Sequence, residues 1–141
     1  MATYVKLNGF VEHMAEKVHN LQADSLKVLL TNTAPVATNS IRSDLVELGA
    51  GNGYTSGGNA ATVSSSAQTT GTYKLVLADV VFTAAGGSIG PFRYAVLYND
   101  TPTSPVDPLI GWWDYGSALT LLDTESFTVD FDPTNGVLTN A

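Results

Sequence analysis

The stretch that decides the predicted fold reads SFTVDFDPTNGVL over residues 126–138. Its first half alternates apolar and polar residues, and Pro133 with the Asn135-Gly136 pair then reverses the chain. Alternation with a period of two, closed by proline and Asn-Gly, is typical of an antiparallel β-hairpin. We therefore expect two paired strands here, joined by a turn over residues 132–136, in a domain built mainly from β-strands.

The preceding residues, back to Tyr73, repeat this organisation of short apolar runs separated by turn residues. The run from Phe92 to Tyr98 is apolar on both faces, so we expect a central or sandwiched strand. Residues 72–83 predict one long strand with a β-bulge near Ala78-Asp79, because the apolar residues change parity there. About seven to nine short strands with regular turns predict an all-β fold, a jelly-roll-like β-sandwich or a related barrel. The other expected elements are strands at Ser25–Thr31, Leu109–Tyr115 and Leu119–Leu122, and a short strand or helical turn at Leu45–Leu48.

The N-terminal region carries four apolar residues at helical spacing: Phe10, Met14, Val18 and Leu21. They predict a short helix over residues 10–21 with Asn8 as its N-cap. A helix of about three turns is not stable alone, so its apolar face needs a surface to pack on. The Gly, Ser, Thr and Asn composition of Gly49–Ser66 instead predicts one long loop.

The chain of 141 residues predicts a single domain, 1–141, made of an N-terminal arm and helix (1–23) and a β-sandwich (24–141). Its 44% hydrophobic content argues against disorder, and its 13% charged content is about half the usual share, which favours assembly. The net charge of −7 with only six bases does not provide the basic stripe that nucleic-acid binding needs. We expect neither nucleic acid nor a membrane as partner, because no apolar run reaches the ~20 residues of a span. The start of the chain lacks a signal-peptide pattern and cysteine is absent, so synthesis in a cytoplasm is expected.

Three motifs that imitate ligand sites are better explained without a cofactor or metal. Glu12, Glu16 and His19 lie at helical spacing, but a helical metal site needs ligands from several helices. The glycines of residues 49–53 lack the Lys-Ser/Thr ending or the following helix of a phosphate loop. The acidic segment 130–136 lacks the glycine and glutamate positions of a calcium loop, and a turn explains it better.

Two further patterns suggest surface recognition or hydrolysis. Trp113 and Tyr115 share parity on one strand and could form an aromatic platform for sugars, which would leave Trp112 in the core. A β-sandwich glycosidase would need two carboxylates flanking a cleft, and Asp114 with Asp123 is the least unsuitable pair. We expect the chain not to be an enzyme.

Four segments in order resemble small structural proteins of tailed-bacteriophage virions, notably jelly-roll capsid decoration (cement) proteins. They are GYTSGG (53–58), FRYAVLYN (92–99), PLIGWWDYG (108–116) and SFTVDF (126–131). The resemblance extends over residues 24–141. Similar modules occur in fibre proteins, so a receptor- or carbohydrate-binding domain of a tail or head fibre is the alternative.

The resemblance implies a structural protein on the capsid exterior of the virion that binds the major capsid protein and cements neighbouring subunits. It also implies self-association as a homodimer or homotrimer, and no catalytic residues or cofactors. We expect residues 1–21 and the 49–66 loop to contact the shell or a second copy. The interface residues predicted on this basis are Tyr4, Phe10, Met14, Tyr54 and Trp113.

Overall fold

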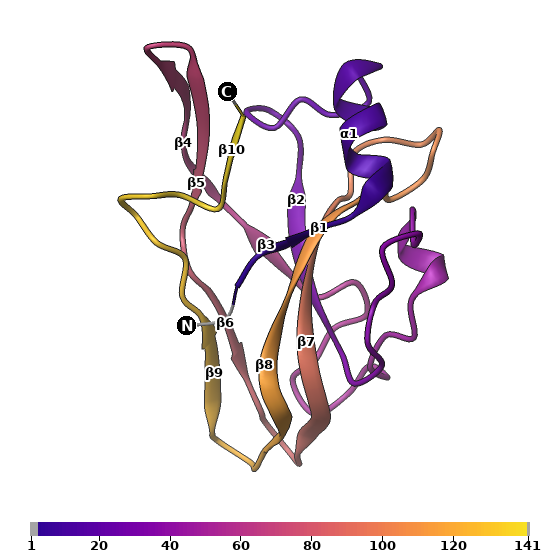
Figure 1. The fold of residues 1–141 in the computed structure, drawn as a ribbon. Helices are drawn as coiled ribbons and strands as arrows, with labels where there is room; N and C mark the ends of the chain where they lie inside the picture. The colour runs from indigo at the N-terminus through magenta and orange to yellow at the C-terminus, as the bar shows by residue number, and fades with distance from the viewer. Residues whose placement is uncertain (1–2, 141) are drawn as a thin grey trace.

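The computed structural model describes residues 3–140, in which ten β-strands accompany one α-helix and one turn of 3-10 helix (Figure 1). The strands are β1 (Val5–Lys6), β2 (Leu26–Thr31), β3 (Asn59–Ala61), β4 (Val63–Thr69), β5 (Thr72–Leu77), β6 (Val80–Thr83), β7 (Ile89–Asn99), β8 (Leu109–Leu121), β9 (Ser126–Val129) and β10 (Leu138–Asn140). The helices are α1 (Asn8–Ala15) and the 3-10 turn η1 (Arg42–Asp44). No helix of residues 3–140 is long and apolar enough to cross a membrane.

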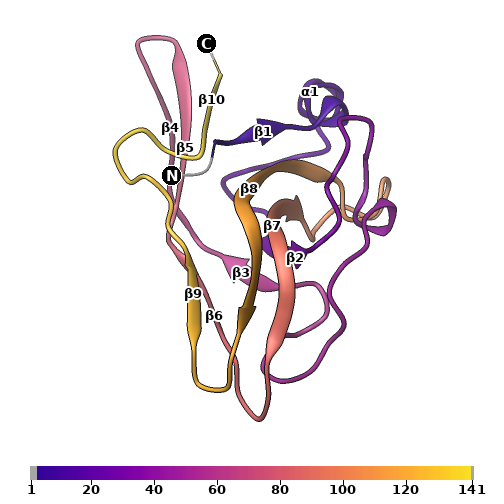
Figure 2. The ribbon, with the colours of Figure 1, turned by 60° about the horizontal axis from the view of Figure 1, so that its bottom comes forward.

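The strands form three antiparallel sheets, in the orders β1-β8-β7-β2-β3, β10-β5-β4 and β6-β9. The five-stranded sheet makes one layer, and the two smaller sheets lie against it (Figures 1 and 2). Aromatic pairs join the layers: Tyr54 with Phe82, Phe92 with Phe127, and Trp113 with Phe131, at ring-centroid distances of 5.9, 5.1 and 5.5 Å. This confirms the predicted all-β fold, a jelly-roll-like β-sandwich with a short N-terminal helix.

The five-stranded sheet is covered on both faces, which explains why its central strands are apolar throughout. On the inner face, residues such as Leu30 and Leu97 belong to the main core, whose members come from the whole length of the chain. On the outer face, Leu29, Val96 and Tyr98 form a second core beneath the loops that follow β2. The two-sided strand predicted at residues 92–98 is therefore confirmed as the middle of β7, between β8 and β2.

The predicted C-terminal hairpin is wrong, although its turn is present. Asp132 Oδ1 accepts hydrogen bonds from the backbone N–H of Thr134 and Asn135, at 2.8 and 3.0 Å, and this turns the chain. However, β9 pairs with β6 and β10 pairs with β5, so the turn joins two sheets. The local pattern identifies the turn correctly, while the partner strands lie 43 to 67 positions earlier in the chain.

The long strand predicted at residues 72–83 is divided into β5 and β6, which belong to different sheets. The change of parity at Ala78-Asp79 is real, since Leu77 and Val80 are both buried. It marks a corner between sheets instead of a bulge within one. The Asp79 carboxylate fixes this corner by accepting a hydrogen bond of 2.9 Å from the Phe131 N–H. The two strands predicted at residues 109–115 and 119–122 are one irregular strand, β8, which ends at Leu121.

The loop predicted over residues 49–66 ends at Gly58, because β3 and most of β4 lie within that range. The composition of this segment is typical of a loop because β4 is an edge strand in which most side chains are exposed. Its backbone hydrogen bonds to β5 decide its conformation, and side-chain burial does not. The short strand or turn predicted at residues 45–48 is reduced to a single bridge between Glu47 and Thr31.

The N-terminal helix is shorter than predicted. It ends at Ala15, shortly before Lys17 adopts a left-handed φ of 66°. Asn8 is its first helical residue, and Leu7 stands at the N-cap without a side-chain hydrogen bond. Leu21 still reaches the core, from a turn instead of a helix. The arm is part of the sandwich, because β1 pairs with β8.

Candidate functional site

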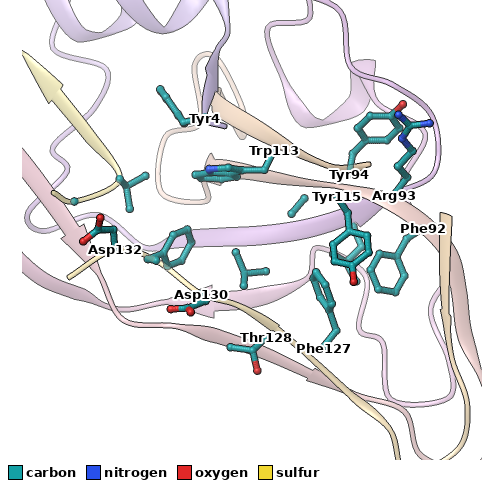
Figure 3. A pocket seen from close by; sticks show the side chains of 16 residues that line it. Tyr4, Phe92, Arg93, Tyr94, Trp113, Tyr115, Phe127, Thr128, Asp130 and Asp132 are labelled. Atoms are coloured by element: carbon teal, nitrogen blue, oxygen red, sulfur yellow. The ribbon is translucent and has the colours of Figure 1, made fainter. Parts of the chain in front are cut away.

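A groove of about 460 Å³ opens between the inner face of β7 and β8 and the strand β9 with the residues that follow it (Figure 3). Its walls are dominated by aromatic side chains, and we call it the aromatic groove. These side chains are Tyr4, Phe92, Tyr94, Trp113, Tyr115, Phe127 and Phe131. Two carboxylates, Asp130 and Asp132, line it in the segment that follows β9, and we call this part its acidic rim (Figure 3).

A bulge in β8 places Tyr115 at the mouth of the aromatic groove. Leu119 pairs with Phe92 and Asp114 pairs with Tyr94, so the four residues 115–118 lie outside the ladder. Gly116 permits this path with a φ of +102°. Bulges commonly re-aim a side chain in this way. As a result the Tyr115 ring is 54% exposed and contacts the Phe127 ring edge-on, with centroids 5.6 Å apart.

The Arg93–Asp114 ion pair holds the start of this bulge. Arg93 Nε and Nη2 donate to the two carboxylate oxygens of Asp114, at 2.7 and 3.0 Å, and the Gly116 N–H donates to Oδ1 at 2.8 Å. The hydrogen bond from Arg93 lowers the pKa of Asp114 below its ordinary value. A glycosidase acid needs a raised pKa, so Asp114 has the opposite character. Asp123, its suggested partner, instead accepts a hydrogen bond of 2.9 Å from the Gly86 N–H.

The structure brings Tyr4 and Trp113 together among the five predicted interface residues. Their rings are 5.5 Å apart, because pairing of β1 with β8 lays the arm beside Trp112 and Gly111. Gly111 makes room for the Tyr4 ring, since a Cβ there would lie 2.1 Å from Tyr4 Cε2. Burial raises the pKa of the Tyr4 hydroxyl. Trp112, predicted as core, is half-buried on the opposite face against the second core.

The other three predicted interface residues lie outside the aromatic groove. Phe10 is buried in the core, and Met14 is half-buried beside it in a second concavity between α1 and residues 135–140. Tyr4 forms a shared wall of the two concavities. Tyr54 is only 3% exposed and its hydroxyl donates to Glu47 at 2.8 Å, so it offers no surface to a partner.

Phe92, Phe127 and Phe131 were not foreseen as groove residues, because their alternation in the sequence indicates only an inward face. They line a groove since β9 pairs with β6 and not with β8, which leaves the layers open along this side. The one available signal was the shared parity of Trp113 and Tyr115. That parity did point to a common aromatic surface.

The predicted helical spacing of Glu12, Glu16 and His19 does not occur, because α1 ends at Ala15. His19 is instead buried, with Nδ1 3.0 Å from Asn99 Nδ2. Its ring also contacts the edge of the His13 ring, with centroids 6.0 Å apart. Within residues 3–140 no three His, Asp or Glu side chains are grouped as metal ligands.

Acidification is expected to weaken the fold through His19. Burial, reinforced by His13 and opposed by Asp24, lowers the His19 pKa from 6.5 to about 4. Below pH 6.5 the unfolded chain takes up this proton while the folded chain does not. The free energy of unfolding should therefore fall between pH 6.5 and pH 4, by about 3 kcal/mol in total. Urea unfolding across this range measures the slope, which His19→Gln should reduce. An equal slope in both proteins would contradict the assignment.

Comparisons with known protein families, with curated proteins and with solved structures found no match to this chain. A functional assignment therefore depends on the geometry of the aromatic groove and on the sequence resemblance. The groove presents aromatic rings against which apolar groups can be buried, with the carboxylates of Asp130 and Asp132 beside them. These are properties of a recognition surface.

Proposed function

We propose that the chain is a structural virion protein that binds the exterior of a bacteriophage capsid and cements neighbouring major capsid protein subunits. The observation that carries the proposal is the aromatic groove, open to the surface at Tyr115. Exposed tyrosine and tryptophan in a concave surface are the residues that contribute most to protein–protein binding. The resemblance of residues 24–141 to capsid decoration proteins supplies the identity of the partner.

Such a protein stabilises a capsid by binding to it and does not need to catalyse a reaction. A ligand that binds only the assembled lattice lowers the free energy of that lattice by its own binding free energy. Many copies on one shell, each a homodimer or homotrimer, add their contributions. The Arg93–Asp114 ion pair fits this role, because its two charges neutralise each other and hold the bulge that carries Tyr115. We propose accordingly that the protein is not an enzyme and acts on the outside of the virion.

Replacing Tyr115 by serine is expected to weaken capsid binding by about ten-fold, because an exposed aromatic anchor is lost. The measurement is co-sedimentation of the purified protein with undecorated capsids of the phage that encodes it. Leu122→Ser is the matched control, since Leu122 is 62% exposed but does not line the groove. Both variants should keep the thermal stability of the original protein, because neither side chain is in the core.

Equal capsid binding by Tyr115→Ser and the unaltered protein would contradict the role of the groove. The alternative is a carbohydrate-binding fibre domain, which the presence of Trp113 and Tyr115 in one groove favours. Aromatic rings beside carboxylates can bind sugars by stacking and hydrogen bonding. Affinity of the isolated protein for glycans, lost in Tyr115→Ser, would support this alternative over the capsid.

Deleting residues 1–21 does not test the arm cleanly as a capsid contact. The deletion removes β1 from the edge of β8 and takes Leu7, Phe10 and Leu21 out of the two cores. Loss of binding would then report loss of the fold. Point substitutions at exposed groove residues avoid this ambiguity.

A further inference from the structure

Strand β9 has one free edge. Among residues 3–140 it pairs only with β6. The Ala84 N–H donates to the Glu125 carbonyl at 2.9 Å, which fixes the phase of this antiparallel pair. In that phase Phe127 and Val129 exchange backbone hydrogen bonds with β6, and the N–H and C=O groups of Ser126 and Thr128 point away from it. A free edge of this kind is a template for another strand.

The free edge of β9 borders the aromatic groove (Figure 3). The inward side chains Phe127 and Phe131 contact Tyr115 and Trp113 of β8, with ring centroids 5.6 and 5.5 Å apart, and these aromatic pairs line the groove. A strand added beside β9 would continue the β6-β9 layer. Every second side chain of that strand would then point into the groove. An added strand could therefore form backbone hydrogen bonds with β9 and also place its side chains in the aromatic groove.

The negative charge of the acidic rim indicates which kind of polypeptide segment can bind at this edge. Asp130 is exposed and forms no ion pair within the described part of the chain. Hydrogen bonds from Asn135 lower the pKa of Asp132, which therefore stays ionised. The nearby cation Lys74 donates instead to the Thr134 carbonyl at 2.7 Å. A second copy of this chain would bring another net charge of −7 to this acidic rim and is disfavoured as the occupant of this edge, whereas a segment carrying Lys or Arg would be attracted.

We propose that the free edge of β9 and the aromatic groove receive an extended segment of the capsid partner. This segment has apolar residues at every second position and a Lys or Arg that faces Asp130. The inference rests on the proposed function and specifies its contact. The partner strand hydrogen-bonds to Ser126 and Thr128, its apolar side chains pack on Trp113 and Tyr115, and its cation offsets the acidic rim.

Amide hydrogen exchange of the unaltered protein, free and bound to undecorated capsids, tests strand addition directly. The amides of Ser126 and Thr128 should become protected on binding by at least about ten-fold. The amides of Phe127 and Val129 should change little, because β6 already protects them. Unchanged exchange at Ser126 and Thr128 in bound protein would overturn the inference and leave the capsid proposal standing. Failure of the unaltered protein to bind capsids would overturn both.

Two substitutions of Thr128 distinguish the contribution of its backbone N–H to capsid binding from that of its side chain. Thr128→Pro removes the outward N–H and leaves the bonds to β6 in place, so capsid binding should fall by about ten-fold or more. Thr128→Val keeps the N–H and should bind within about two-fold of the original protein. Unaltered circular dichroism and melting of Thr128→Pro would show that the fold is kept. Equal binding by both variants would count against the added strand.

The charge of the occupant is tested by Asp130→Asn. This change should weaken capsid binding by about three- to ten-fold at low salt, and the difference should shrink as salt is raised. Glu16→Gln is the matched control, because it removes one exposed carboxylate after α1 and away from the groove. Tighter binding of Asp130→Asn would show that the occupant is acidic or neutral and would contradict this part of the inference.

Discussion

A Gly58→Ala protein is expected to lose its native fold at room temperature. Gly58 has a φ of +77°, and a Cβ placed on it would lie 1.8 Å from the Val28 carbonyl oxygen and 2.7 Å from Leu29 Cα. Both neighbours are backbone atoms of the central strand β2, so neither can move aside cheaply. Steric overlap of this kind falls among the substitutions that cost more than about 4 kcal/mol, against a typical total stability of about 5–15 kcal/mol. Circular dichroism and denaturant unfolding measure the loss.

Gly71→Ala is the matched control for this prediction. Gly71 has a similar φ of +86°, but no atom lies within 4 Å of the position its Cβ would take. The substitution therefore lowers the free energy of unfolding only by the backbone strain of a left-handed alanine, about 1–2 kcal/mol, and the protein should stay folded. Similar losses for the two variants would show that left-handed backbone strain, and not the close approach of Gly58 to β2, limits that position.

A Glu47→Ala protein is expected to lose about 3 kcal/mol of unfolding free energy. The Glu47 carboxylate accepts from Arg42 Nε and Nη2 at 3.0 and 2.7 Å, and from the Tyr54 hydroxyl and the Gly57 N–H at 2.8 and 2.5 Å. Its side chain is only 13% exposed. Removing it leaves the partly buried Arg42 cation and two other donors without their acceptor, which is the costly way to break an ion pair. Urea unfolding at pH 7 measures the change.

Asp114→Asn gives the comparison for an exposed pair of the same geometry. The Arg93–Asp114 pair is also bidentate, but both side chains are nearly 40% exposed. Water and salt screen such a pair, so its loss should lower the free energy of unfolding much less than the loss of Glu47 does. If Asp114→Asn destabilised the protein as much as Glu47→Ala, burial would not be the reason for the effect at Glu47.

The sequence predicts well those features that depend on neighbours in the chain. The strand at residues 25–31, the two-sided strand near residue 95 and the reversal at residues 132–136 each follow from local alternation or turn chemistry. The loop at residues 49–66 fails because β4 gains its conformation from hydrogen bonds to β5, and its own composition gives no sign of them. The hairpin fails because β9 and β10 find partners far back in the chain.

The aromatic groove, like the strand pairing, depends on contacts between distant residues that a local sequence pattern does not predict. Trp113 and Tyr115 could be assigned to one surface from parity alone. Tyr4 joins them only because β1 pairs with a strand more than 100 residues later. Phe127 and Phe131 join them only because β9 leaves its edge beside β8 unpaired. The Gly116 bulge, which turns Tyr115 outward, depends on the register between β7 and β8 and has no counterpart in a local pattern.

The pairing of β1 with β8 and of β10 with β5 has a consequence for how the protein is made. β1 pairs with residues 111–112, more than 100 positions later in the chain, and β10 pairs with residues 73–75, more than 60 positions earlier. The five-stranded sheet can therefore be completed only after residues 111–112 have left the ribosome, and the sheet of β10, β5 and β4 only after residues 138–140. Folds closed by such distant pairings acquire structure slowly. Refolding after dilution from urea should accordingly take milliseconds to seconds, the range of β-sandwiches, and not the microseconds of helical bundles.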